Sequence, residues 1–175
     1  AGSLHQRGTN MTYEEICDFE TLYTAYLAAR KGKRKKRRTL EFEENLLENL
    51  KDISDDLSNG VYQPGEFERF KIFEPKERDI EAPAFKDKVI LHAVADNGLY
   101  DAITSSFVRN NCANQRGKGT ADAVIRLKQC FVRYYAQYKT ADGWILKCDI
   151  RHFFASIDHD ILKAKLRKVA RKHDI

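Results

Sequence analysis

Apolar side chains recur every three or four residues along the first third of the chain, in two segments with a basic run between them. The first segment covers residues 16–27, and Thr12 and Glu15 before it have the spacing of a capping box. The second segment begins at Thr39 and ends at Asn59-Gly60, a pair that often follows the last turn of a helix. We therefore expect two amphipathic helices that pack against each other.

The spacing changes to alternation after residue 61. Residues 67–73 (FERFKIF) and 78–82 (RDIEA) flank a proline-containing turn at 74–77. This arrangement predicts a β-hairpin with Phe70 and Ile72 on one face. The opposite face mixes cations with aromatic rings, a combination that suits contact with a nucleic acid as well as with water.

Helical spacing returns in the second half of the chain. It predicts a helix at 86–103, a polar loop with glycines at 104–119, and a helix that Thr120 caps. An Asp-Gly turn at 142–143 is followed by WILKCD (144–149), which reads as a strand, and a last amphipathic helix follows. The whole pattern predicts an α+β protein.

Length and composition favour one globular unit, because 175 residues with 42% hydrophobic content can bury a single core. The longest apolar runs are far shorter than the roughly 18 to 20 residues of a membrane-spanning helix, so we expect a soluble, cytoplasmic protein without a membrane partner. Residues 1–10 precede Met11 without periodicity and read as an expression scar. The four widely spaced cysteines predict reduced, packed thiols.

Positive charge is concentrated at two places on an otherwise acidic chain. Residues 31–38 (KGKRKKRR) hold seven cations, and residues 163–172 hold six, whereas residues 39–162 hold 16 Lys and Arg against 21 Asp and Glu. A dense basic run suits an RNA backbone, because neutralised phosphates release condensed counterions. A solvated linker explains the run equally well. The RNA-binding candidates are Lys33, Arg34, Lys35, Lys36, Arg37 and Arg38.

Asp149 ends the predicted strand WILKCD, and two phenylalanines follow it. A carboxylate at a strand end is held rigidly and faces the crevice beyond the sheet, where it can bind a hard metal ion. An acidic residue after a strand is also a common helix cap or turn former. The residue alone leaves both interpretations open.

Three sequence blocks occur in a fixed order along the chain: 72–94 (IFEPKERDIEAPAFKDKVILHAV), 114–123 (NQRGKGTADA) and 145–162 (ILKCDIRHFFASIDHDIL). Their order and spacing resemble those of bacterial retroelement reverse transcriptases, specifically the enzymes of group II introns and diversity-generating retroelements. The resemblance covers about residues 61–170, and its last block is the most specific. It implies a fingers region at 61–141 and the beginning of a palm at 142–175, after N-terminal helices with the basic run at 11–60.

The third block places the resemblance on particular residues. Asp149 matches the first catalytic aspartate, which binds the Mg²⁺ ions of the complete enzyme. Ile150 would add its backbone carbonyl as a hard ligand. Phe154 matches the aromatic residue that excludes a 2′-hydroxyl from the incoming sugar, and Phe153 would then point into the core.

The first two blocks imply contacts with nucleotide and template. Lys76 and Arg78 match the cations that grip the triphosphate of the incoming dNTP, and both are also ordinary residues for a solvent-facing turn. The template-binding loop would consist of Gln115, Arg116, Gly117 and Lys118, where the glycine permits close approach of the backbone to the template. An ordinary glycine loop before a capped helix is the alternative.

The sequence departs from the family pattern at one point. The Tyr-x-Asp-Asp box that supplies the other palm carboxylates does not occur in it. We therefore expect a truncated palm that does not polymerise alone, and whose exposed edge favours self-association. Two other functions stay open: a noncatalytic RNA-binding module in which Asp149 is structural, and a helical interaction protein without a nucleic-acid partner.

Overall fold

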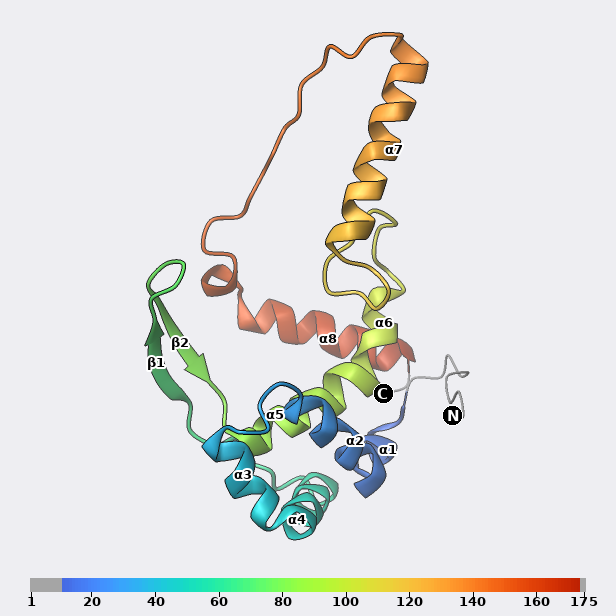
Figure 1. Cartoon of the computed structure of the whole chain (residues 1–175). Helices are drawn as coiled ribbons and strands as arrows, with labels where there is room; N and C mark the ends of the chain where they lie inside the picture. The colour runs from blue at the N-terminus through green and yellow to red at the C-terminus, as the bar shows by residue number, and fades with distance from the viewer. Residues whose placement is uncertain (1–10, 174–175) are drawn as a thin grey trace, which may run out of the picture. The chain divides into compact units, whose positions relative to one another are not determined.

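The computed structural model describes residues 11–173 and has an α+β fold, with helices and a two-stranded antiparallel hairpin (Figure 1). The chain divides into a first unit, Ala1–Ala102 with Lys168–Ile175, and a second unit, Ile103–Arg167. The segment interpreted as an expression scar lies outside the described residues. Between residues 11 and 173, no helix is both long enough and apolar enough to cross a membrane.

The first predicted helix is two helices, α1 (Tyr13–Cys17) and α2 (Phe19–Arg30). The expected capping box is confirmed, because the Thr12 hydroxyl accepts from the Glu15 N–H and the Glu15 carboxylate accepts from the Thr12 N–H. Asp18 has an extended backbone, and its carboxylate caps α2. A short capping side chain in the middle of the apolar stripe therefore divides it.

The second predicted helix is also divided, into α3 (Arg37–Glu44) and α4 (Leu46–Ser58), with Asn45 between them. It begins two residues before Thr39, inside the basic run, and Thr39 is buried rather than capping. The predicted stop is confirmed: Asn59 caps α4, and Gly60 has a φ of 65°, which glycine adopts easily.

The hairpin forms as predicted, from β1 (Glu68–Ile72) and β2 (Arg78–Ala82). The strands are antiparallel, with Phe70 opposite Ile80. A buried carboxylate holds the segment that leads into β1. Asp87 accepts a hydrogen bond of 2.7 Å from the Tyr62 hydroxyl and one of 3.0 Å from the Gly65 N–H.

The third predicted helix is continuous but changes its hydrogen-bond pattern. It begins as α5 (Phe85–His92), passes through the π-helical segment η1 (Ala93–Leu99) and ends as α6 (Tyr100–Thr104). The polar loop predicted to follow it is confirmed.

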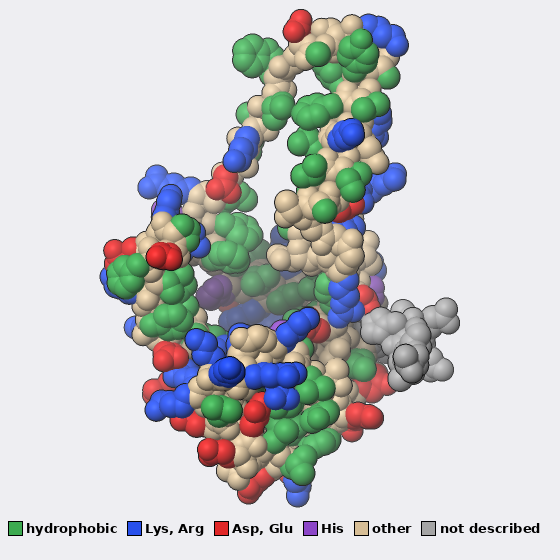
Figure 2. Space-filling model, in the orientation of Figure 1, with side chains coloured by type: hydrophobic (Ala, Val, Ile, Leu, Met, Phe, Trp, Pro, Cys, Tyr) green, Lys and Arg blue, Asp and Glu red, His purple; other side chains and the backbone are tan. Residues whose placement is uncertain are grey.

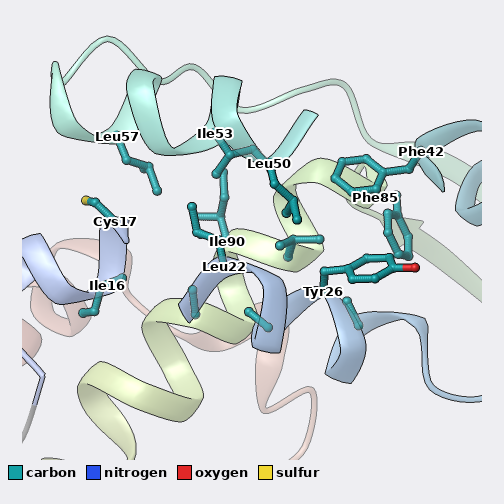
Figure 3. Close-up of a cluster of buried hydrophobic side chains, with 14 residues drawn as sticks. Ile16, Cys17, Leu22, Tyr26, Phe42, Leu50, Ile53, Leu57, Phe85 and Ile90 are labelled. Carbon is teal, nitrogen blue, oxygen red and sulfur yellow. The ribbon is translucent and has the colours of Figure 1, made fainter. Parts of the chain in front are cut away.

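The hydrophobic core lies in the first unit, where α2, α4 and α5 meet (Figure 3). Leu50 and Ile53 of α4 are fully buried and point toward Leu22 and Ile90 of the other two helices. An aromatic cluster closes one end, where the ring of Phe42 lies 5.1 Å from that of Phe85. Close packing of this kind accounts for most of the stability of a small domain.

In the second unit, α7 (Thr120–Tyr138) is long and amphipathic, but none of its residues is buried. Its predicted apolar stripe is confirmed as one helix face but not as core. The predicted Thr120 cap is wrong, because Gly119 holds the N-cap position and no side chain bonds there. The stripe consists of Val124, Leu127, Phe131, Tyr135 and Tyr138.

The predicted strand at 144–149 is absent: these residues are exposed and have no regular secondary structure. A strand needs a neighbour for its backbone N–H and C=O groups, and in the described chain only β1 and β2 pair. The segment is exposed, so these groups face solvent. A short 3-10 turn, η2 (Phe154–Ser156), and the helix α8 (His159–His173) follow, with Asp158 accepting from two N–H groups of the first turn of α8.

All four cysteines are free, as predicted. Cys17 is buried in the core and Cys112 is half-buried, but Cys130 and Cys148 are exposed, so the expectation of packed thiols is wrong for these two. Cys130 lies on α7 and Cys148 in the segment after it, and both elements lack a buried side.

Candidate functional site

Asp149 lies at the edge of an open depression of about 530 Å³ in the second unit. Phe153, Phe154, Cys148 and Ile150 line the same depression. The two aromatic rings meet edge to face, with their centroids 5.4 Å apart. The third sequence block thus folds so that its carboxylate and its aromatic pair share one surface.

A tight turn places the two phenylalanines. His152 has a φ of 49°, and the Ser156 hydroxyl donates to the Phe153 carbonyl at 2.9 Å. Phe154 is 84% exposed, so its ring is accessible to a ligand. Phe153 is 49% exposed, so the expectation that it points into the core is wrong: this unit buries no side chain on which the ring could pack.

The ligands for a metal at this depression are few. Asp149 is its sole acidic lining residue, and Ile150 can add a backbone carbonyl oxygen. Among residues 11–173, no group of three or more His, Cys, Asp and Glu side chains could hold a metal ion. A pair of Mg²⁺ ions needs several carboxylates, so the described part of the chain does not by itself fit two metals.

The hairpin of the first unit carries the predicted triphosphate-binding cations. Lys76 lies in its turn and Arg78 begins β2, and both are exposed. Neither forms an ion pair with any described residue. Two other hairpin cations are neutralised, because Arg69 contacts Glu81 at 2.9 Å and Lys71 contacts Glu77 at 2.6 Å.

The predicted template loop is held by its own side chains. The Gln115 amide donates to the Asn111 carbonyl at 2.7 Å, and the Lys118 ammonium donates to the same carbonyl and to the Gln115 side-chain oxygen. Lys118 therefore stabilises the loop. Arg116 and Gly117 are exposed, and Gly117 has a φ of 71°, which favours glycine.

The basic run connects α2 to α3, and Figure 2 shows Lys and Arg side chains gathered over this segment. Arg37 and Arg38 lie within α3, where Arg37 pairs with Glu41 at 3.4 Å and Arg38 with Glu68 at 3.1 Å. The remaining cations are exposed and have no acidic partner among the described residues. They are Lys31, Lys33, Arg34, Lys35 and Lys36.

A half-buried cluster joins the two helices at the ends of the run. The Glu43 carboxylate of α3 accepts from the Tyr26 hydroxyl at 2.6 Å and contacts Arg30 at 2.9 Å, while the Arg30 guanidinium lies over the Tyr26 ring. Burial, with a contribution from Glu43, raises the pKa of the Tyr26 phenol to about 12. These contacts hold α2 and α3 together on either side of the run.

Sequence reasoning missed an ion pair at the start of α7. Asp122 contacts Arg126 at 2.7 Å and accepts from the Cys112 thiol at 3.2 Å. The Arg126 hydrogen bond, with that of Cys112, lowers the pKa of the Asp122 carboxyl, whereas partial burial and Asp122 raise the pKa of the thiol. The spacing of four residues between Asp122 and Arg126 is the signal that could have identified the pair.

Comparison with known proteins matches the chain to no protein-family model and to no curated protein. The structure brings Asp149, Ile150 and Phe154 together, and separately Gln115 with Lys118. Lys76 and Arg78 share the hairpin of the other unit.

Proposed function

We propose that the chain is part of an RNA-directed DNA polymerase, a reverse transcriptase of the bacterial retroelement type. The complete enzyme uses dNTPs, Mg²⁺, an RNA template and a primer. The observation that carries the proposal is that Asp149 and Phe154 line one open depression. The resemblance of the third sequence block to reverse transcriptases implies that Asp149 binds the metal and that Phe154 contacts the incoming sugar.

The hairpin gives independent support. Its cations at Lys76 and Arg78 are the ones that the first sequence block assigns to the triphosphate, and both lack an acidic partner among residues 11–173. Arg69 and Lys71 on the same hairpin are neutralised by neighbours. An exposed, unpaired guanidinium and ammonium are suited to the charge of a triphosphate.

The number of carboxylates at the depression limits the chemistry that this chain can perform by itself. With one acidic residue at the depression, residues 11–173 do not supply the ligands for two metal ions. The 175 residues therefore bind substrates in this proposal, and nucleotide transfer requires carboxylates beyond those described.

Substitution of Asp149 in the complete polymerase tests the proposal. Asp149→Ala is expected to lower primer extension on an RNA template at least about a hundredfold, because a metal ligand is lost, while RNA binding by fluorescence polarisation stays unchanged. Asp142→Ala, which removes another exposed carboxylate of the same irregular segment, serves as the matched control and retains activity. Full extension activity in the Asp149→Ala enzyme would contradict the proposal.

A noncatalytic RNA-binding module is the second candidate, and the unpaired cations at 33–36 favour it. In such a protein those cations bind RNA, and Asp149 only caps a turn. The same experiment separates the two functions, because a binding module shows RNA affinity but no template-dependent incorporation in either variant.

A further inference from the structure

A second concave surface lies in the second unit, along one face of α7 and beside the loop residues Arg109 and Asn110. The groove has a volume of about 770 Å³ and lies apart from Asp149 and Phe154, which do not line it. Four of its lining side chains are cationic and none is acidic. These cations are Arg109, Arg126, Lys128 and Arg133.

Most of this positive charge is not neutralised by the protein. Arg126 pairs with Asp122, but Arg133 donates only to the Gln129 carbonyl and the Cys130 sulfur. Arg109 and Lys128 have no acidic partner among the described residues, and both are exposed. The groove therefore carries an uncompensated positive potential, which attracts a polyanion.

Helix geometry arranges the donors in a row. Arg126, Gln129 and Arg133 follow one another at intervals of three and four residues, so they lie along one side of α7 over about 10 Å. That length corresponds to about three stacked nucleotides. The Arg133 guanidinium at one end has no acidic partner among the described residues and can bind a phosphate through two hydrogen bonds.

Apolar side chains complete the lining. Ile125 and Val132 lie seven residues apart beside the donors, and both are more than half exposed. This face differs from the one that carries the stripe of Leu127 and Phe131, and Figure 2 shows hydrophobic side chains on one side of α7 and Lys and Arg side chains on the other. A partner that covers the stripe would leave the groove open.

We propose that this groove, lined by Lys128, Arg133 and their neighbours, binds the backbone of single-stranded RNA. Cations around the groove attract the phosphates, and the aliphatic side chains of Ile125 and Val132 beside them can contact sugars and bases. The choice of RNA over another polyanion rests on the proposed polymerase function. The positive charge of the groove follows from its lining residues alone and does not depend on that function.

Salt-dependent RNA binding by the whole protein tests this site. A fluorescent single-stranded 20-nucleotide RNA is titrated at several salt concentrations with the unaltered protein, Lys128→Gln and Arg133→Gln. Each substitution is expected to lower the affinity about threefold or more, and to reduce the slope of log affinity against log salt by about 0.7. The matched control is Lys51→Gln on the exposed side of α4, which leaves both quantities unchanged.

The outcomes decide between ligands. Equal affinity and slope for Lys128→Gln, Arg133→Gln and the unaltered protein would overturn the site. A fluorescent poly-glutamate peptide that binds as tightly as RNA, and loses as much affinity in the two variants, would overturn RNA as the ligand. The assay involves no synthesis, so an inactive polymerase with normal groove binding would count against the proposed function alone.

Discussion

The helices α4 and α7 are both amphipathic, yet they end in opposite environments. The 13-residue α4 buries Leu50, Ile53 and Leu57, whereas the 19-residue α7 buries nothing. The difference arises from neighbours, since α4 packs on α2 and α5. An apolar stripe therefore predicts an amphipathic helix. Whether its apolar face contributes to stability depends on a neighbouring element that buries it.

The two units differ in the same way: one contains the buried core, and the other contains several of the exposed candidate site residues. Every buried side chain among residues 11–173 lies in the first unit, while Asp149, Phe154 and Arg116 are exposed residues of the second unit. Segments with few buried apolar contacts open at little cost in free energy, and functional loops are drawn from such segments. The first unit is thus the stable body, whereas Asp149, Phe154 and Arg116 belong to the unit without buried side chains.

The largest expected effect comes from truncating equivalent leucines in the two helices. Leu50→Ala leaves a cavity in a fully buried site and is expected to lower the free energy of unfolding by about 2–5 kcal/mol. Leu127→Ala removes a half-exposed side chain and is expected to change it by less than about 0.5 kcal/mol. Urea unfolding followed by circular dichroism measures both.

Equal losses in the two variants would contradict the contrast, because Leu127 would then have to be buried against a partner. Leu47→Ala on the exposed side of α4, where the side chain is 67% exposed, is the control for helix propensity. The free energy of unfolding of Leu47→Ala should change as little as that of Leu127→Ala.

A smaller effect is expected from the hydroxyl that anchors the hairpin linker. Tyr62→Phe removes the hydrogen bond to Asp87 and is expected to lower the free energy of unfolding by about 1–2 kcal/mol. Tyr135→Phe, on the exposed stripe of α7, is the matched control and is expected to change nothing measurable. Chemical unfolding at pH 7 tests this pair.

The cost of Tyr62→Phe should also depend on pH. Burial, with the Asp87 carboxylate, raises the pKa of the Tyr62 phenol above its ordinary value of 10.0. A raised pKa adds stability that is complete below pH 10.0 and is lost as pH rises toward the pKa of the folded state. The difference in the free energy of unfolding between the unaltered protein and Tyr62→Phe should therefore shrink above pH 10.0. A difference that grows above pH 10.0 would contradict a raised pKa of Tyr62.

Local signals in the sequence predicted the fold well wherever neighbouring residues decide the structure. The capping box at Thr12, the stop at Asn59-Gly60 and the whole hairpin follow from such signals. The breaks at Asp18 and Asn45 were missed, because an apolar stripe that runs past a capping residue reads as one helix.

The predicted strand at 144–149 failed for a different reason. Its apolar character is real, but a strand also needs a partner, and pairing over long distances in sequence cannot be predicted from one segment. At the candidate sites, the proline-containing turn in the sequence correctly predicted that Lys76 and Arg78 lie on the hairpin. The groove on α7 was missed because the apolar stripe is the stronger periodic signal of that helix.

Hydrogen exchange followed by mass spectrometry tests most directly whether the segment that contains Asp149 lies outside the stable body. Peptides from α4 and α5 are expected to exchange at least about a hundredfold more slowly than a peptide that covers 144–150, whose N–H groups face water. Protection of 144–150 equal to that of α4 would mean that this segment is a paired strand, and would contradict the account.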